Sequence, residues 1–163
     1  MAVLAAKRKE SRFEPIVQSE AIHQMLVELM QHSFGIKNMD TMVRRQYIAG
    51  KCELDAYWRY CYLLRNAKVR IDRLAAELTC LIRAANTIYP VTIHEYEKRR
   101  DNQNYAIIVC EQLLNELQHI VEIFDVDINL YKRHIQAIER EIALIKRWRQ
   151  SDNRLKARLQ GSD

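Results

Sequence analysis

A row of apolar residues between Ile128 and Ile145 is spaced as in a helix that packs against other helices. Its members follow one another in steps of three and four residues, at Ile128, Tyr131, Ile135, Ile138, Ile142 and Ile145. This heptad spacing is typical of a helix with one buried face. The same steps occur earlier in the chain, at Ile107, Cys110, Leu114, Leu117, Val121 and Phe124. Two such rows predict packed helices rather than strands.

The small supply of turn-forming residues limits how many connections the chain can build. Its 163 residues include three glycines and two prolines, so long helices joined by short loops are expected. The length suits one domain with a sizeable core. We therefore predict an all-α fold, an up-down-up-down antiparallel four-helix bundle with a short extra helix between helices one and two.

Capping and helix-breaking residues set the expected bounds of these helices. Proline suits a first helical turn and disfavours helix at the residue before it, so Pro15 marks a start and Pro90 an end. Thr92 followed by Glu95 is a capping box. The expected helices span Pro15 to Gly35, residues 40–49, Glu53 to Thr87, Thr92 to Phe124 and Ile128 to Gln150. The core row of the Glu53 to Thr87 helix is expected at Tyr57, Cys61, Leu64, Lys68, Ile71, Ala75, Leu78, Ile82 and Ala85.

Positive charge is concentrated at the two ends of the chain. The formal net charge is +5, of which residues 1–12 carry +3 and residues 132–158 carry +6, so the remainder is acidic. Basic ends favour an anionic partner such as nucleic acid, and a merely solvated basic surface is the alternative. The predicted organisation is a basic flexible arm over 1–12, the bundle over 13–150 and a basic C-terminal tail over 151–163.

The candidate nucleic-acid-binding residues lie in these two basic ends. Lys and Arg contact phosphates without reading sequence, and an aromatic ring can stack on a base. Trp148 follows Ile145 by three residues, so a core position is the alternative for its ring. The candidates are Lys7, Arg8, Lys9, Arg12, Lys146, Arg147, Trp148, Arg149, Arg154, Lys156 and Arg158. Further basic residues that could add to a face are Arg59, Arg65, Lys68, Arg70 and Arg73.

Patterns for catalysis and metal binding are weak. Two Glu-x-x-His pairs, Glu20 with His23 and Glu116 with His119, resemble half of a two-metal bundle site. The second pair lies outside the apolar row, and no inward glutamates complete a ligand set. The sequence has no nucleophile set and too few glycines for a phosphate-binding loop. We expect no catalytic residue, no metal, no cofactor and no enzymatic activity.

The polar segment from Glu95 to Asn104 interrupts the apolar row that begins at Ile107. Continuing the heptad backwards places Gln103, Arg100 and Tyr96 toward the bundle. A buried Arg100 would need a partner, for example an acidic residue on a neighbouring helix, unless it lies in an open end of the bundle. The segment is therefore expected to be a structural polar cluster or, alternatively, a polar pocket or subunit contact at one end of the bundle.

Cysteine spacing and hydropathy indicate an intracellular protein. Cys52, Cys61, Cys80 and Cys110 show no paired short spacing, which favours reduced cysteines in a cytoplasmic protein. The first apolar run ends at Lys7, and no later run is long enough to cross a bilayer. We expect no membrane association.

Several short strings resemble one family of small helical proteins. They are Met1 to Leu4 with Lys7-Arg8 and Glu10-Ser11, Ala85 to Pro90, Glu95-Tyr96, Arg99-Arg100 and Gln103-Asn104. These strings resemble the accessory variability determinant proteins, which are encoded beside reverse transcriptases in diversity-generating retroelements.

The resemblance implies a basic four-helix bundle that forms a homo-oligomeric ring, a pentamer in the known type. Such a protein would bind the element's reverse transcriptase and template RNA, with DNA as a further candidate ligand. It would support mutagenic cDNA synthesis without a catalytic site of its own. A structural helical oligomer or protein adaptor with no nucleic-acid role is the alternative function.

Overall fold

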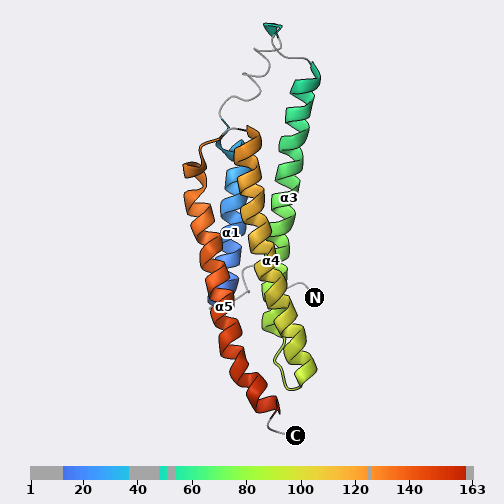
Figure 1. The fold of residues 1–163 in the computed structure, drawn as a ribbon, viewed down its shortest axis with the longest axis vertical. Helices are drawn as coiled ribbons and strands as arrows, with labels where there is room; N and C mark the ends of the chain where they lie inside the picture. The colour runs from blue at the N-terminus through green and yellow to red at the C-terminus, as the bar shows by residue number, and fades with distance from the viewer. Residues whose placement is uncertain (1–12, 37–47, 51–53, 125, 161–163) are drawn as a thin grey trace, which may run out of the picture.

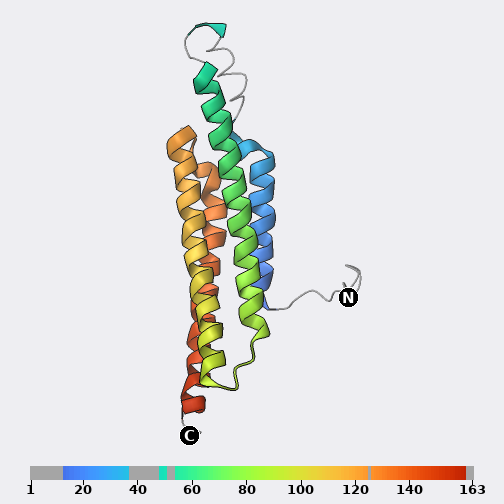
Figure 2. The ribbon, with the colours of Figure 1, turned by 90° about the vertical axis from the view of Figure 1, so that its right-hand side faces the viewer.

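The computed structural model describes residues 13–36, 48–50, 54–124 and 126–160, and within these ranges it contains helices and no strand. The long helices are α1 (Glu14–Gln31), α3 (Leu54–Thr87), α4 (Ile93–Phe124) and α5 (Lys132–Gln160). They lie side by side along the long axis of the molecule (Figures 1 and 2). The predicted all-α class is confirmed, and the helix expected over residues 40–49 lies largely outside the described residues.

The core forms where each long helix meets two others. Both α1 and α4 contact α3 and α5. The predicted row of α3 is buried over most of its length, at Ile71, Ala75, Leu78, Ile82 and Ala85. Nearer the start of α3, the side chains of Cys61, Leu64 and Lys68 are half-buried.

The heptad row of α4 predicts only part of its buried surface. Cys110 and Leu117 are buried as expected, whereas Leu114 is half-buried. Because α4 packs against two helices, Leu113 and Ile120 beside the row are also fully enclosed. A single heptad row therefore underestimates the apolar face of this helix.

A capping box begins α4 as predicted. The backbone N–H of Thr92 donates to Glu95 Oε2 at 3.1 Å, and the N–H of Glu95 donates to Thr92 Oγ1 at 3.2 Å. Hydrogen bonds from the backbone N–H groups of Val91 and Thr92 hold the pKa of Glu95 below its usual value. The end of α3 at Thr87 also agrees with the helix-breaking role of Pro90.

The end predicted for the first helix at Gly35 is wrong, since α1 ends at Gln31 and a separate 3-10 helix, η2 (Ser33–Gly35), follows. Gly35 has a φ of +72°, and a Cβ there would lie 3.2 Å from Leu130 Cδ1. The carbonyl of the buried Phe34 accepts a hydrogen bond from the hydroxyl of Tyr131 at 2.8 Å. This turn therefore ties the end of α1 to the start of α5.

Both predicted ends of the last helix differ from the structure. A 3-10 helix, η3 (Ile128–Tyr131), precedes α5, and the Ile128 side chain is 45% exposed rather than in the core. At the other end α5 continues past Gln150 to Gln160, so residues 151–160 extend the helix. The extension is held by contacts of Asp152 and Asn153 with α4, which a heptad count that stops at Trp148 does not anticipate.

Candidate nucleic-acid interface

The second half of α5 carries most of the basic residues that the sequence suggested. The side chains of Lys146, Arg147, Arg154, Lys156 and Arg158 are exposed, and that of Arg149 is half-buried. Arg147 and Arg154 are seven residues apart, so they lie on one side of the helix about 10 Å apart along its axis. We call Lys146, Arg147, Arg149, Arg154, Lys156 and Arg158, which are spread around more than half of the helix, the α5 basic face.

The basic arm of the N-terminus joins the bundle beside this face. Residues 1–12, with Lys7, Arg8, Lys9 and Arg12, lie outside the described residues. The next residue, Phe13, packs its ring edge-on against Trp148, with 4.8 Å between ring centroids. The fold thus brings the attachment point of the arm next to the α5 basic face, although the two are far apart in sequence.

Trp148 belongs to the core and is not a base-stacking residue. Its side chain is 8% exposed, and the guanidinium of Arg99 lies 4.9 Å from its ring centroid. Its assignment to the nucleic-acid-binding residues was wrong, because the apolar row of α5 continues through Trp148. The heptad spacing had already indicated a core position as the alternative.

Asp152 is the one acid between Lys146 and Gln160, and it is turned into the bundle. Its Oδ2 lies 2.8 Å from Arg99 Nε, and its Oδ1 accepts from an Arg99 terminal nitrogen at 2.9 Å. The amide of the buried Gln103 donates to Oδ2 at 2.8 Å. The carboxylate is therefore neutralised inside the structure and presents no negative charge beside the α5 basic face.

The polar segment at the start of α4 serves mainly to hold α5. Arg100 has partners on a neighbouring helix as predicted, although they are uncharged oxygens: it donates to the carbonyl of Arg149 at 2.8 Å and to Asn153 Oδ1 at 3.3 Å. The hydroxyl of Tyr96 donates to the same Asn153 oxygen at 3.3 Å. The acid-paired arginine is its neighbour Arg99. The segment is thus a structural network within the chain.

Burial also lowers the negative charge elsewhere on α5. Glu141 is fully buried, and this burial raises its pKa to about 8, with Glu14 adding to the rise and Arg140 opposing it. It is therefore mostly protonated at neutral pH. Of the three acids between Lys132 and Arg158, only Glu139 is exposed. The basic character of this helix exceeds what the charge count of the sequence suggests.

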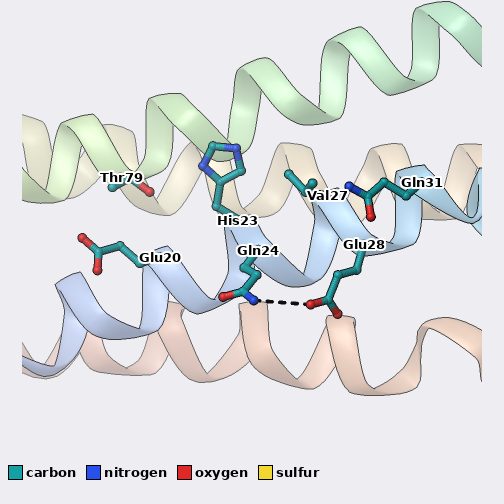
Figure 3. A pocket seen from close by; sticks show the side chains of 7 residues that line it. All are labelled: Glu20, His23, Gln24, Val27, Glu28, Gln31 and Thr79. Atoms are coloured by element: carbon teal, nitrogen blue, oxygen red, sulfur yellow. Dashed lines mark hydrogen bonds between the residues drawn. The ribbon is translucent and has the colours of Figure 1, made fainter. Parts of the chain in front are cut away.

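Three of the four residues in the Glu-x-x-His pairs contact a neighbouring helix. Glu20 pairs with Arg83, His23 Nε2 lies 3.3 Å from Asp72 Oδ1, and Glu116 Oε1 accepts from Arg70 at 2.9 Å. Figure 3 shows the open groove that contains Glu20 and His23, whose side chains point in different directions. Within the described residues there is no group of three His, Cys, Asp or Glu that could hold a metal ion.

The described cysteines differ widely in exposure. Cys110 is buried, Cys61 is half-buried and Cys80 is exposed. Burial, with the nearby Glu141, raises the pKa of the Cys110 thiol far above its usual value. Cys110 is therefore a packing residue and a poor nucleophile.

Tyr89 is an exposed aromatic residue near the α5 basic face that the sequence reasoning missed. It lies in the α3–α4 connection and is 79% exposed. The connection is held in place because Pro90 is buried and the carbonyl of Ile88 accepts from Arg99 at 3.0 Å. The only signal for Tyr89 in the sequence is an aromatic residue placed directly before a proline.

Comparisons of the chain with models of protein families, with curated proteins and with solved structures found no match. In the part of the chain that the structure describes, no helix has the length and apolar character required to span a bilayer.

Proposed function

We propose that this protein is a non-enzymatic accessory subunit that binds nucleic acid through the α5 basic face. The observation that carries the proposal is the burial of Asp152 against Arg99 while the surrounding lysines and arginines remain at the surface. Phosphates approaching this side of α5 would meet cations without a competing carboxylate from the same stretch of helix. Contacts of this kind give affinity without sequence preference.

The resemblance described above supports a more specific role. We propose that the nucleic acid is the template RNA of a diversity-generating retroelement and that the protein also binds the reverse transcriptase, in support of mutagenic cDNA synthesis. The proposed form is an up-down-up-down bundle assembled into a homo-oligomeric ring in the cytoplasm. The short α3–α4 and α4–α5 connections favour that order of helices.

Salt dependence of RNA binding tests the proposal directly. If Arg147, Arg154 and Arg158, which lie on one side of α5, contact phosphates of a single strand, log K falls with log salt with a slope of about −2. Affinity should then fall about 16-fold between 50 and 200 mM salt. Fluorescence anisotropy of a labelled RNA measures this, and an affinity that hardly changes over this range would contradict the proposal.

A matched pair of variants separates the α5 basic face from net charge. R147E/R154E reverses two charges on the face, and K132E/R133E makes the same change at the other end of α5. The ion pair of Arg133 with Glu28, at 3.7 Å, is exposed and contributes little stability. We expect R147E/R154E to weaken binding and flatten the salt slope while K132E/R133E binds nearly as wild type. Equal losses in the two variants would refute an interface on this face.

The alternative function is a structural oligomer or adaptor whose basic end meets an acidic protein. It is favoured by the exposed side chains of Tyr89 and Val91 in the α3–α4 connection. It predicts a stable multimer in light scattering together with no RNA binding at physiological salt.

A further inference from the structure

The connection between α3 and α4 presents an aromatic ring at the end of the molecule where the last turns of α5 lie (Figures 1 and 2). Tyr89 is 79% exposed, the largest exposure among the large apolar and aromatic side chains that the structure describes. Val91, two residues on, is also exposed. Because α3 ends at Thr87 and α4 begins at Ile93, both side chains stand on a turn rather than on a helix face.

The backbone of this turn is held on both sides of Tyr89. The proline that follows restricts Tyr89 to extended conformations, and Pro90 is itself buried. Farther along, Glu95 Oε2 accepts hydrogen bonds from the backbone N–H groups of Val91 and Thr92, at 2.9 and 3.1 Å. The turn is therefore ordered before any ligand arrives, so contact with the Tyr89 ring loses little conformational entropy of the backbone.

A single arginine links this turn to α5. One terminal nitrogen of Arg99 donates to the carbonyl of Ile88 at 3.0 Å, and the other donates to Asp152 Oδ1 at 2.9 Å. The residue before Tyr89 and the α5 residue Asp152 therefore share one guanidinium. The next turn of α5 carries Lys156, whose side chain is exposed. A chain-like ligand that contacts the Tyr89 ring can thus also reach cations of α5.

The acids around this turn are hydrogen-bonded within the chain or lie beside a cation. Residues 84–94 contain no Asp or Glu. Glu95 accepts from backbone N–H groups at the helix cap, and Asp152 is ion-paired inside the structure. Glu97 is exposed, but the adjacent Lys98 is exposed as well. The turn therefore combines an aromatic ring with the positive charge of α5, a combination by which proteins bind single-stranded nucleic acids.

We propose that Tyr89 stacks on an unpaired base of a single-stranded nucleic acid whose phosphates contact the last turns of α5. The cations of α5 hold the strand without reading its sequence, and the ring accepts any base because each base has a π-face. Bases inside a duplex are covered by their neighbours, so Tyr89 adds a preference for unpaired nucleotides. This inference rests on the proposed function for the class of ligand and adds a residue that distinguishes single strands from duplexes.

Substitutions of Tyr89 test the stacking, with fluorescence anisotropy of a labelled uridine oligonucleotide as the assay. Y89A should weaken binding of this single strand about tenfold, the effect of losing one stacked base, and should leave the affinity for a duplex of the same length unchanged. Y89F keeps the ring and should bind as wild type. The control is Y105A, since Tyr105 is also exposed, at 58%, but lies on α4 one turn from the acidic Asp101. Equal single-strand affinity of wild type and Y89A, or an equal loss in Y89A and Y89F, would overturn the proposal.

Fluorescence gives a second and more direct readout. The Y89W substitution in a W58F background adds an indole at the turn, while the remaining Trp148 is buried. A base stacked on an indole quenches its emission, so the uridine oligonucleotide should quench Y89W/W58F much more than W58F alone. A duplex of the same length should quench Y89W/W58F much less. Equal quenching of Y89W/W58F and W58F by the single strand would overturn the proposal.

The outcomes for the inference and for the proposed function can be told apart. If R147E/R154E weakens RNA binding while Y89A does not, the proposed function stands and the stacking is refuted. If Y89A weakens single-strand binding while R147E/R154E binds as wild type, the stacking stands and the interface on the Arg147 side of α5 fails. If Y89A dissociates a multimer in light scattering and leaves RNA affinity unchanged, the turn contacts protein, which also refutes the inference.

Discussion

Glu141 provides the sharpest test of the packing of this bundle. It lies on the buried side of α5 between Ile138 and Ile145 and is fully enclosed. Neither of its carboxylate oxygens has a hydrogen-bond partner among the residues that the structure describes. Burial, and secondarily the negative charge of Glu14, raises its pKa to about 8 from its ordinary value of 4.5. We predict that replacing it with glutamine changes how stability depends on pH.

The sign and size of the effect follow from proton linkage. The folded state holds the Glu141 proton to higher pH than the unfolded chain does, so stability is lost as pH rises from the unfolded pKa to the folded one. The full shift corresponds to about 5 kcal/mol, and about 3–4 kcal/mol of it falls between pH 5 and pH 8. That is a large fraction of the stability of a typical domain, about 5–15 kcal/mol.

Urea denaturation followed by circular dichroism, at several pH values from 5 to 8, measures this difference. We expect the wild type to lose about 3–4 kcal/mol relative to E141Q across that range. His134, whose pKa is lowered mainly by burial, has the opposite pH dependence, but it is present in both proteins and cancels. The E139Q variant, at an exposed position on the same helix, should keep the wild-type profile. Parallel pH profiles for wild type and E141Q would refute the reasoning.

Three further predictions concern contacts between elements, and each is measured as the change in unfolding free energy in urea. D152A should destabilise the fold by about 3–5 kcal/mol because it leaves the largely buried guanidinium of Arg99 without the carboxylate of Asp152 as its ion-pair partner. A loss below about 1 kcal/mol would mean that water replaces the carboxylate as hydrogen-bond partner of this guanidinium. T92A should cost about 1 kcal/mol by removing the hydroxyl that accepts from the Glu95 amide, and an unchanged stability would show that the capping box is frayed. G35A should cost at least about 1 kcal/mol, since the φ of Gly35 is +72° and Leu130 is close, and a stabilised variant would argue against the turn at Gly35 and its contact with η3.

The helices of this protein could be located from the sequence because their signals are local. The heptad rows, the capping box at Thr92 and the position of Pro90 place α3 and α4 near their observed bounds, whereas α5 begins four residues later and ends ten residues later than predicted. The predicted helix ends are wrong where contacts between residues far apart in the sequence determine where a helix stops. The turn at Gly35 depends on Tyr131, and the last turns of α5 depend on α4.

The sequence predicted which residues of the candidate site are basic, but not which of its side chains are exposed. The basic residues of α5 were found from the charge count, and heptad spacing already allowed Trp148 to be a core residue. Trp58 and Tyr62 lie outside the core row predicted for α3, and their side chains are exposed, at 61% and 66%.

By itself the sequence determined that this chain is helical and which face of each helix is apolar, because both follow from the spacing of residues along one helix. Only the tertiary structure decided which polar residues lie inside. Arg99 and Arg100 both border the buried face of α4, and Asp152 opposite Arg99 selects that arginine as the ion-paired one. Glu141 is buried because α5 faces the core there, and Asp152 is buried because α4 supplies its partners. The burial of these two acids leaves the surface of α5 more basic than its composition suggests.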